Sequence, residues 1–138
     1  MKYMILVKAT AESEAGVMPP ESLFAAMATY HEQLAKAGIL VDASGLQRSA
    51  KGWRIKYSGE KRLVTDGPFT ETKELVAGYT VINVGSREEA LEWTQRFPNP
   101  AIDGGVAEIE VRPYFDLEAF GDSPSIERFR KIEMEKRP

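Results

Sequence analysis

Apolar and polar positions along the first forty residues predict a strand followed by a helix. Residues 2–8 are almost entirely apolar between two lysines, which is typical of a strand buried on both faces. Residues 9–19 are small, acidic and proline-containing, and they predict a surface connection. From Pro20, expected as the first helical residue, to Gly38, expected to end the helix, side chains of an inward face recur every three or four positions: Leu23, Phe24, Met27, Tyr30, His31 and Leu34.

The middle of the chain predicts four further strands, two of them joined in a hairpin. Residues 39–45 begin with three aliphatic side chains and run to a glycine. In residues 53–57 apolar side chains alternate with basic ones, and after the turn Ser58-Gly59-Glu60 residues 62–65 return, which predicts a β-hairpin. Residues 75–84 are rich in β-branched and aromatic side chains and predict another strand.

The next segment predicts a second helix and a final strand. Ser86 and Glu89 stand at the first and fourth positions of a capping box, which marks the start of a helix. Pro98 is expected to end this helix because proline lacks a backbone donor. In residues 106–112 the apolar side chains Ala107, Ile109 and Val111 alternate with residues that are mostly charged. This alternation predicts a strand with one buried face, closed by Pro113.

This order of elements predicts an α+β protein with a ferredoxin-like sandwich, in which both helices cover one face of an antiparallel sheet. We assign residues 1–113 to this domain and residues 114–138 to a C-terminal tail. The tail is expected to hold a helix over residues 126–136 whose scattered apolar side chains need a docking surface. Apolar groups on the uncovered sheet face predict a homodimer, on which the tail docks.

Composition narrows the range of functions. The chain has 138 residues, which fits one domain, and its 18 basic and 21 acidic residues leave a net charge of −3. This balance argues against direct nucleic-acid binding. Without cysteine the chain has no disulfide and no thiolate nucleophile, and without a run of about 18 apolar residues it predicts no membrane span. We therefore expect a cytoplasmic protein, and no motif predicts a cofactor.

The loop of residues 65–74 is the best candidate for a site, because it places three carboxylates and one ammonium group between two strands. Neighbouring carboxylates raise one another's pKa, and a nearby lysine lowers it. The pKa values of the carboxyl groups are thereby pushed apart, as acid–base catalysis requires. The loop also has a structural explanation. In that explanation the Asp66 side chain shapes a turn, Gly67 permits a positive φ and Pro68 fixes the exit.

His31 is the single histidine of the chain, and helical spacing places it on the inward face of the first long helix. It is a candidate general base or ligand, and with Asp66, Glu71 or Glu74 it would make a metal site of one histidine and carboxylates. A lone histidine on an apolar helix face is more often a hydrogen-bonded packing residue. We favour the packing role and predict no metal.

Residues 48–62 are strongly basic, with one glutamate among the charged side chains: Arg48, Lys51, Arg54, Lys56, Lys61 and Arg62. Such a hairpin is suited to binding an anion or an acidic partner. The alternative is that lysine and arginine protect an edge strand from unwanted pairing. Trp53 and Tyr57 are expected to belong to the dimer interface.

Several short motifs together point to a known family. Asp66-Gly67-Pro68-Phe69 is followed by residues 70–74 and by Gly78-Tyr79. Further motifs lie along the chain: Met1-Lys2-Tyr3-Met4, Ala37-Gly38, Gly45-Leu46, Glu110-Val111-Arg112-Pro113 and residues 115–121. This set resembles the DGPF branch of the YCII-related proteins. The resemblance implies a dimeric α+β barrel, a superfamily that includes monooxygenases, lactone isomerases and chlorite-dismutase-like proteins.

The chain departs from the wider YCII pattern at the site. A His–Asp pair is proposed there as the active site, and related enzymes perform dehydrochlorination. By the resemblance, Met27 occupies the histidine position and Phe97 the aspartate position, so this mechanism does not transfer. Some members of the DGPF branch occur near or fused to extracytoplasmic-function sigma factors.

Two functional hypotheses follow, and the sequence leaves open whether the protein is an enzyme. In the first, a pocket between the first long helix and the sheet binds a small polar molecule and carries out cofactor-independent proton transfer or elimination. Its catalytic residues are His31, Asp66, Glu71 and Lys73, and its binding residues are Gly67, Pro68, Phe69, Glu74 and Tyr79. In the second, the protein is a non-catalytic partner or sensor of a transcription regulator such as a sigma factor.

Overall fold

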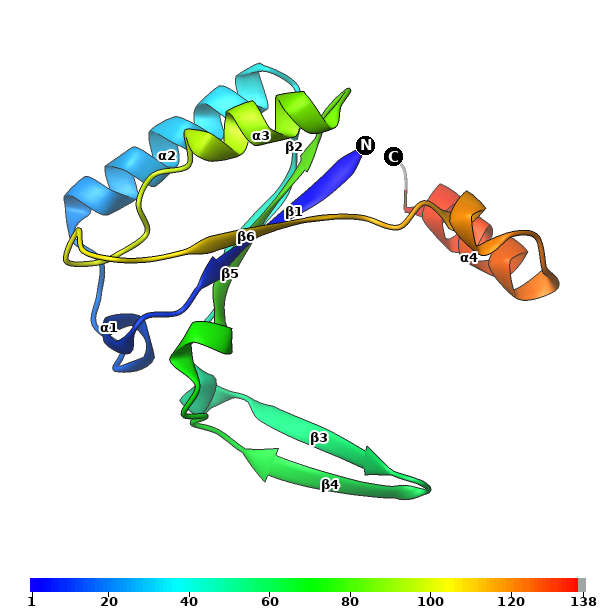
Figure 1. Cartoon of the computed structure of the whole chain (residues 1–138), viewed down its shortest axis with the longest axis horizontal. Helices are drawn as coiled ribbons and strands as arrows, with labels where there is room; N and C mark the ends of the chain where they lie inside the picture. Colours follow the sequence, from blue (N-terminus) through cyan, green and yellow to red (C-terminus); the bar gives the residue numbers. More distant parts are fainter. Residues whose placement is uncertain (137–138) are drawn as a thin grey trace.

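The computed structural model describes residues 1–136 and shows a four-stranded antiparallel sheet with two helices on one face (Figure 1). The strand order is β2-β5-β1-β6. The strands are β1 (Lys2–Lys8), β2 (Leu40–Gly45), β5 (Val76–Asn83) and β6 (Ile109–Pro113). The covering helices are α2 (Glu21–Lys36) and α3 (Arg87–Gln95). This arrangement confirms the predicted ferredoxin-like α+β fold.

The core lies between the sheet and these two helices. Alternation along β1 sends Tyr3 and Ile5 toward the helices, where they join Tyr30, Leu34 and Ile82 in one hydrophobic cluster. Ile5, Leu34 and Ile82 are fully buried. Full burial of such a side chain contributes about 1.5–3 kcal/mol relative to an exposed position. The central position of β1 therefore explains why its sequence is almost continuously apolar.

The opposite face of the sheet is not covered by any helix within residues 1–136 (Figure 1). Met4 and Leu6 of β1 point to this side, because they alternate with the inward residues. In the ladder with β5, Met4 lies beside Val81 and Leu6 beside Tyr79. This open sheet face thus carries an apolar strip in the middle of the sheet.

The segment before and at the start of the first long helix differs from the sequence prediction in two ways. The connection before the first long helix contains a short helix, α1 (Ala11–Glu14), which begins with a reciprocal capping box between Thr10 and Ser13. Helix α2 begins at Glu21, so Pro20 is its N-cap and not its first helical residue. Its expected end is confirmed, because Gly38 adopts a φ of 76° directly after the helix.

The cap of α3 is only half of the predicted capping box. The Ser86 side chain accepts a hydrogen bond from the Glu89 backbone N–H at 3.1 Å, as expected. The Glu89 carboxylate, however, accepts from the Gly85 N–H at 2.9 Å and not from Ser86. The carboxylate therefore holds the residue before the cap and stabilises the turn that leads from β5 into the helix.

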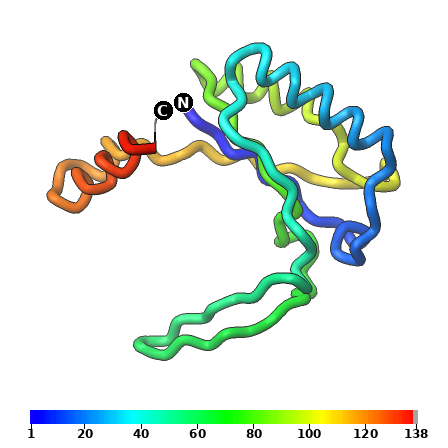
Figure 2. The backbone as a smooth tube through the Cα atoms, turned by 180° about the vertical axis from the view of Figure 1, so that it is seen from behind, coloured from blue at the N-terminus to red at the C-terminus, as the bar shows by residue number. Residues whose placement is uncertain are grey.

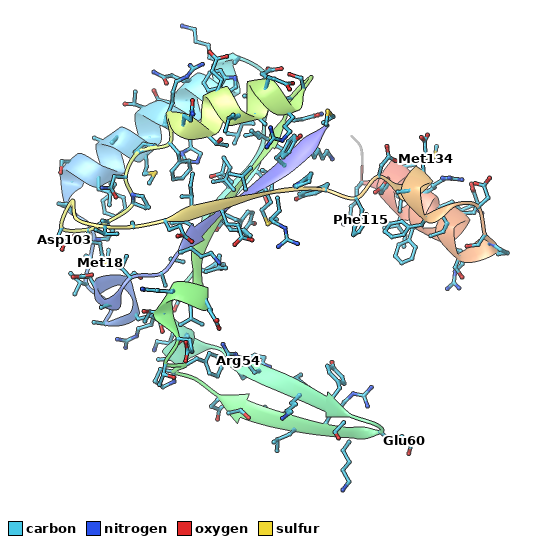
Figure 3. All side chains as sticks on the ribbon, viewed as in Figure 1. Met18, Arg54, Glu60, Asp103, Phe115 and Met134 are labelled. Carbon is cyan, nitrogen blue, oxygen red and sulfur yellow. The ribbon has the colours of Figure 1, made fainter. Side chains whose placement is uncertain are left out.

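The predicted hairpin forms a separate two-stranded sheet of β3 (Trp53–Ser58) and β4 (Lys61–Asp66). It projects from the body of the molecule, with Glu60 at its tip (Figures 2 and 3). One side, which we call the apolar hairpin face, carries Trp53, Ile55, Tyr57 and Val64. The other side carries Arg54, Lys56 and Lys61 together with Leu63. Every residue of both strands is exposed in the single chain.

The C-terminal tail is helical, as predicted, and extends away from the sheet (Figure 1). It contains a short 3₁₀ turn, η3 (Leu117–Phe120), and helix α4 (Pro124–Glu135), capped by Ser123. The rings of Phe115 and Phe120 lie 4.8 Å apart, but α4 has no buried residue. Figure 3 shows Phe115 and Met134 within this separate arm. Within residues 1–136 no helix is long and apolar enough to cross a lipid bilayer.

Candidate functional site

A cavity of about 820 Å³ lies between the first half of α2 and the sheet. The inward face of α2 is buried only in its second half, at Tyr30 and Leu34, whereas Phe24 in the first half is 48% exposed. The first half of the helix therefore borders a space that the chain does not fill. Apolar side chains dominate its lining: Val7, Val17, Met18, Leu23, Phe24, Met27, Leu46, Phe97 and Ile102.

The polar part of the cavity lining is small and basic. It includes His31, Thr80, Ser13, Ser44, Gln47, Arg48 and Lys51. No carboxylate belongs to the lining in the part of the chain that the structure describes. Arg48 and Lys51 flank or belong to η1 (Ser49–Lys51), a 3₁₀ turn between β2 and the hairpin. The cavity thus combines an apolar body with one positively charged edge.

His31 lines the cavity with both ring nitrogens hydrogen-bonded. Nδ1 lies 2.7 Å from the Met27 carbonyl oxygen, which only accepts, so Nδ1 carries a proton and donates. In the neutral ring Nε2 accepts from the Thr80 hydroxyl at 2.8 Å. Thr80 is itself buried on β5. These contacts match the favoured interpretation of His31 as a packing residue that joins α2 to the sheet.

Tyr79 also borders the cavity, and its hydroxyl donates to the Asp42 carboxylate at 3.0 Å. This hydrogen bond, together with the negative charge of Asp42, raises the pKa of the Tyr79 hydroxyl. Asp42 lies on β2 and belongs to the exposed part of the strand. The phenol of Tyr79 is therefore held in its neutral form by a neighbouring strand.

The candidate loop does not line this cavity, although we expected it to. The sequence-predicted residues Asp66, Gly67, Pro68, Phe69, Glu71, Lys73 and Glu74 are all absent from its lining. The side chains of Asp66, Glu71, Lys73 and Glu74 are exposed. Lys73 belongs to η2 (Thr72–Glu74) and borders a second cavity of about 460 Å³ together with Glu12 and Glu108. Of the predicted site residues, His31 and Tyr79 border the cavity and the loop does not. The Tyr79 side chain lies on the open sheet face beside Leu6, so its hydroxyl meets Asp42 and not His31.

Contacts with η1 explain where the loop lies. The Gly67 N–H donates to the Gly52 carbonyl at 3.0 Å, and the Phe69 N–H donates to the Ser49 hydroxyl oxygen at 3.0 Å. Ser49 in turn donates to the Glu14 carboxylate through its backbone N–H at 2.8 Å and through its hydroxyl. Ser49 therefore links the loop, the 3₁₀ turn and α1, and the loop packs behind the turn that borders the cavity.

Gly67 has a different structural role from the one predicted. It does not adopt a positive φ. Instead, a Cβ at this position would lie 1.9 Å from the Ser49 carbonyl oxygen, so only glycine fits against that backbone. Phe69 is covered by the Arg54 guanidinium, which stands 3.8 Å from the ring centroid. The Asp-Gly-Pro-Phe segment is thus held in place by close backbone and stacking contacts.

Arg48 and Lys51 line the cavity but were not predicted as site residues. The basic run over residues 48–62 was visible, but it gave no means of separating these two side chains from the hairpin residues. Within residues 1–136 no group of three or more histidine, cysteine, aspartate or glutamate residues is arranged to hold a metal ion.

Comparisons with known proteins identify related sequences. The pattern of the YCII-related domain matches residues 1–115. An uncharacterised protein of Rhizobium meliloti (strain 1021) is 33% identical over 78 residues, which cover 56% of this chain. The matched region spans 61% of the length of that relative.

Among solved structures, the chain is similar to the 5-chloro-2-hydroxyhydroquinone dehydrochlorinase (TftG) from Burkholderia phenoliruptrix AC1100, in complex with 2,5-dihydroxybenzoquinone. The TM-score is 0.46 and the sequence identity 15%, over 83% of this chain and 94% of the other. A likeness this distant carries no argument about the chemistry of this chain.

Proposed function

The chain belongs to the family of YCII-related domains, and from this premise we propose that it binds a small molecule in the cavity beneath α2. The single observation that carries the proposal is the unfilled space of about 820 Å³ along an apolar helix face. Ligand sites in proteins typically measure about 300–1,000 Å³ and are mainly apolar, with a few polar groups that orient the ligand. This cavity has both properties.

The geometry favours binding over acid–base catalysis in a single chain. By the resemblance, Met27 and Phe97 stand where the wider family carries its His–Asp pair, and both line the cavity. His31 is close to them, but its nitrogens are occupied by Met27 and Thr80. Proton transfer or elimination by Asp66, Glu71 and Lys73 requires a second copy to bring its loop to the cavity. We therefore place binding first and this chemistry second.

The binding proposal is tested with N-phenyl-1-naphthylamine, an uncharged aromatic probe that fluoresces in apolar surroundings. Leu23→Trp fills the cavity from α2, and we expect it to weaken probe binding at least about tenfold. Leu91→Trp is the matched control, because Leu91 is half exposed on α3 and does not line the cavity. Equal binding by both variants and the natural chain would contradict the proposal.

We also propose that two copies form a homodimer through the open sheet face and the apolar hairpin face, with the tail docked on the assembly. Trp53 and Tyr57 are 65% and 64% exposed in the single chain. An isolated two-stranded hairpin is marginally stable in water, so the β3–β4 ribbon needs a covering surface. A dimer of the DGPF type supplies one.

The alternative partner of the hairpin is a transcription regulator. The observation that favours it is the exposed basic side of the ribbon, with Arg54, Lys56 and Lys61, which suits an acidic protein surface. Recovery of a stoichiometric regulator with a chain that is monomeric by itself would support this alternative. A stable dimer that buries the hairpin would contradict it.

A further inference from the structure

We propose that the ligand of the cavity is an organic anion whose charge is held by Arg48 and Lys51, and that the Asp66–Phe69 loop positions this basic edge. The inference rests on the proposed binding function and adds the chemical class of the ligand. It is carried by the charges of the cavity lining and by the contacts that hold η1.

The charge distribution favours an anion. Arg48 and Lys51 are the arginine and lysine side chains that line the cavity within residues 1–136, and no carboxylate of these residues shares the lining. Neither residue forms an ion pair within residues 1–136. The Glu14 carboxylate near Arg48 is held by Ser49. Two cations without an ion-pair partner beside an apolar space therefore leave a binding position for a negative group.

The Arg48 side chain has donors available for that group. Among the described contacts, its guanidinium makes one hydrogen bond, from Nη1 to the Ala15 carbonyl at 3.4 Å. A guanidinium has five N–H donors in a planar fork that matches a carboxylate or sulfonate. The long bond to Ala15 therefore orients the side chain across the cavity edge and leaves most of its donors for a ligand.

Gly16 permits this orientation. Its φ of 78° lies in the region that favours glycine, and a Cβ there would lie 2.9 Å from Nη1 of Arg48. Any other residue at this position would push the guanidinium away from the loop that follows α1. The backbone of residues 15–16 is thus shaped to receive the Arg48 head group.

The loop holds the turn that carries both cations. Ser49 lies directly after Arg48, and its hydroxyl accepts from the Phe69 N–H while it donates to Glu14. Gly67 packs against the carbonyl of the same serine. Because three segments converge on Ser49, the backbone at Arg48 has little freedom. The loop acts on the ligand through this backbone, so Ser49, Gly67 and Phe69 are positioning residues.

The matching ligand has an aromatic-sized apolar body and one anionic group such as a carboxylate, phenolate or sulfonate. The apolar body lies against the first half of α2, near Leu23 and Met27. The anionic group lies at the rim, where it keeps contact with water and is not fully desolvated. Arg48 and Lys51 are exposed, as a position at the rim requires.

Two probes with the same aromatic body test the proposal. We compare 1-anilinonaphthalene-8-sulfonate, which carries the anionic group, with N-phenyl-1-naphthylamine, which lacks it. The natural chain is expected to bind the sulfonate at least about tenfold more tightly than the amine. Arg48→Gln and Lys51→Gln are each expected to lower sulfonate affinity about fivefold or more, with amine affinity unchanged.

Amine binding serves as the folding control, because a variant that binds the amine normally has an intact cavity. Lys56→Gln removes a cation of the hairpin that does not line the cavity, and it should keep the full preference for the sulfonate. Ser49→Ala should reduce that preference severalfold at unchanged amine affinity, and Ser49→Thr, which retains a hydroxyl, should restore it.

The outcomes separate the two proposals. Equal affinity of the natural chain for both probes, or an unchanged sulfonate preference in Arg48→Gln and Lys51→Gln, overturns the anionic ligand and leaves the cavity as a binding site. Failure of both probes to bind, or amine binding that Leu23→Trp does not weaken, overturns the binding function itself.

Discussion

Tyr30 and His31 are neighbours on α2, and each uses a polar atom to hold a different element. The Tyr30 hydroxyl donates to the Trp93 carbonyl of α3 at 2.7 Å, whereas His31 joins the Thr80 hydroxyl of β5. Their rings also pack edge to face, with centroids 5.6 Å apart. Because buried polar groups need partners, this residue pair fixes the position of α2 over both the sheet and α3.

Because of Tyr30, the free energy of unfolding of the chain is expected to fall at alkaline pH. Burial raises the pKa of its hydroxyl from the ordinary 10.0 to about 12, although the charge of Arg96 acts in the opposite direction. Between these values the unfolded chain has lost a proton that the folded chain keeps. Stability from this group is therefore complete below pH 10 and is lost as the pH rises toward 12. The loss amounts to at most about 2–3 kcal/mol.

We expect Tyr30→Phe to lower the free energy of unfolding by about 1–2 kcal/mol near neutral pH, because the Trp93 carbonyl loses its donor. The deficit should shrink as the pH rises above 10, since the variant lacks the group that titrates. Urea unfolding of both proteins at a series of pH values measures the difference. A deficit that stays constant with pH would show that burial of Tyr30 does not control this dependence.

At this scale, the sequence allowed the position of His31 to be predicted but not that of the loop. Helical spacing alone placed His31 on the inward face, and a packing role follows from an apolar surrounding. The charged side chains of residues 65–74 suggested that the loop lines the cavity, but its exposed carboxylates do not belong to the lining. The contact that decides its position joins Phe69 to Ser49, 20 residues away, and no local pattern reports it.

Two helices with similar serine caps differ in what they pack against. Ser86 caps α3, which lies on the core through Ala90, and Ser123 caps α4, which has no buried residue. The Ser123 side chain accepts from the Ile126 N–H at 3.1 Å, the same distance as in the α3 cap. A loss of helix stability in α3 is transmitted directly to the core. In one chain, α4 has no buried contact that does the same.

We expect Ser86→Ala to lower the free energy of unfolding by about 1 kcal/mol, the usual cost of a lost cap. If the tail docks on a second copy, as we propose, Ser123→Ala should cost a comparable amount. Ser125→Ala, on α4 but without a cap bond, is the control and should change stability little. Denaturant unfolding at one fixed protein concentration compares the three variants. A loss confined to Ser86→Ala would contradict docking of the tail.

Strands and helices were predictable where their periodicity extends over a full element. Residues 53–57 alternate clearly, and α2 keeps its three- and four-residue spacing for its whole length, so both were found. Helix α1 was missed because its four residues are too few to show a period. Its start depends on the local Thr10–Ser13 cap, which the small and acidic composition of the segment concealed.

The whole molecule presents its uncovered surfaces on the side away from the helices. Figures 1 and 2 show the hairpin and the tail as two arms that extend from the sheet, each separate from the α2–α3 layer. The apolar hairpin face and the apolar strip of the open sheet face belong to this arrangement. The side chains of the apolar hairpin face are exposed in one chain, and exposed apolar patches of this kind favour the proposed dimer.

The dimer is expected to be obligate, because one chain leaves too much apolar surface in water for a stable folded monomer. Sedimentation of the natural chain at low micromolar concentration should show the dimer and no folded monomer. Ile55→Ser places a hydroxyl on the apolar hairpin face and should produce dissociation with loss of folded structure. Lys56→Ser is the matched control one residue further on, because its side chain lies on the opposite face of the same strand. Dissociation caused equally by both substitutions would remove the distinction between the two faces. A folded monomer of the natural chain would instead assign the hairpin to a different partner and favour the regulator-binding alternative.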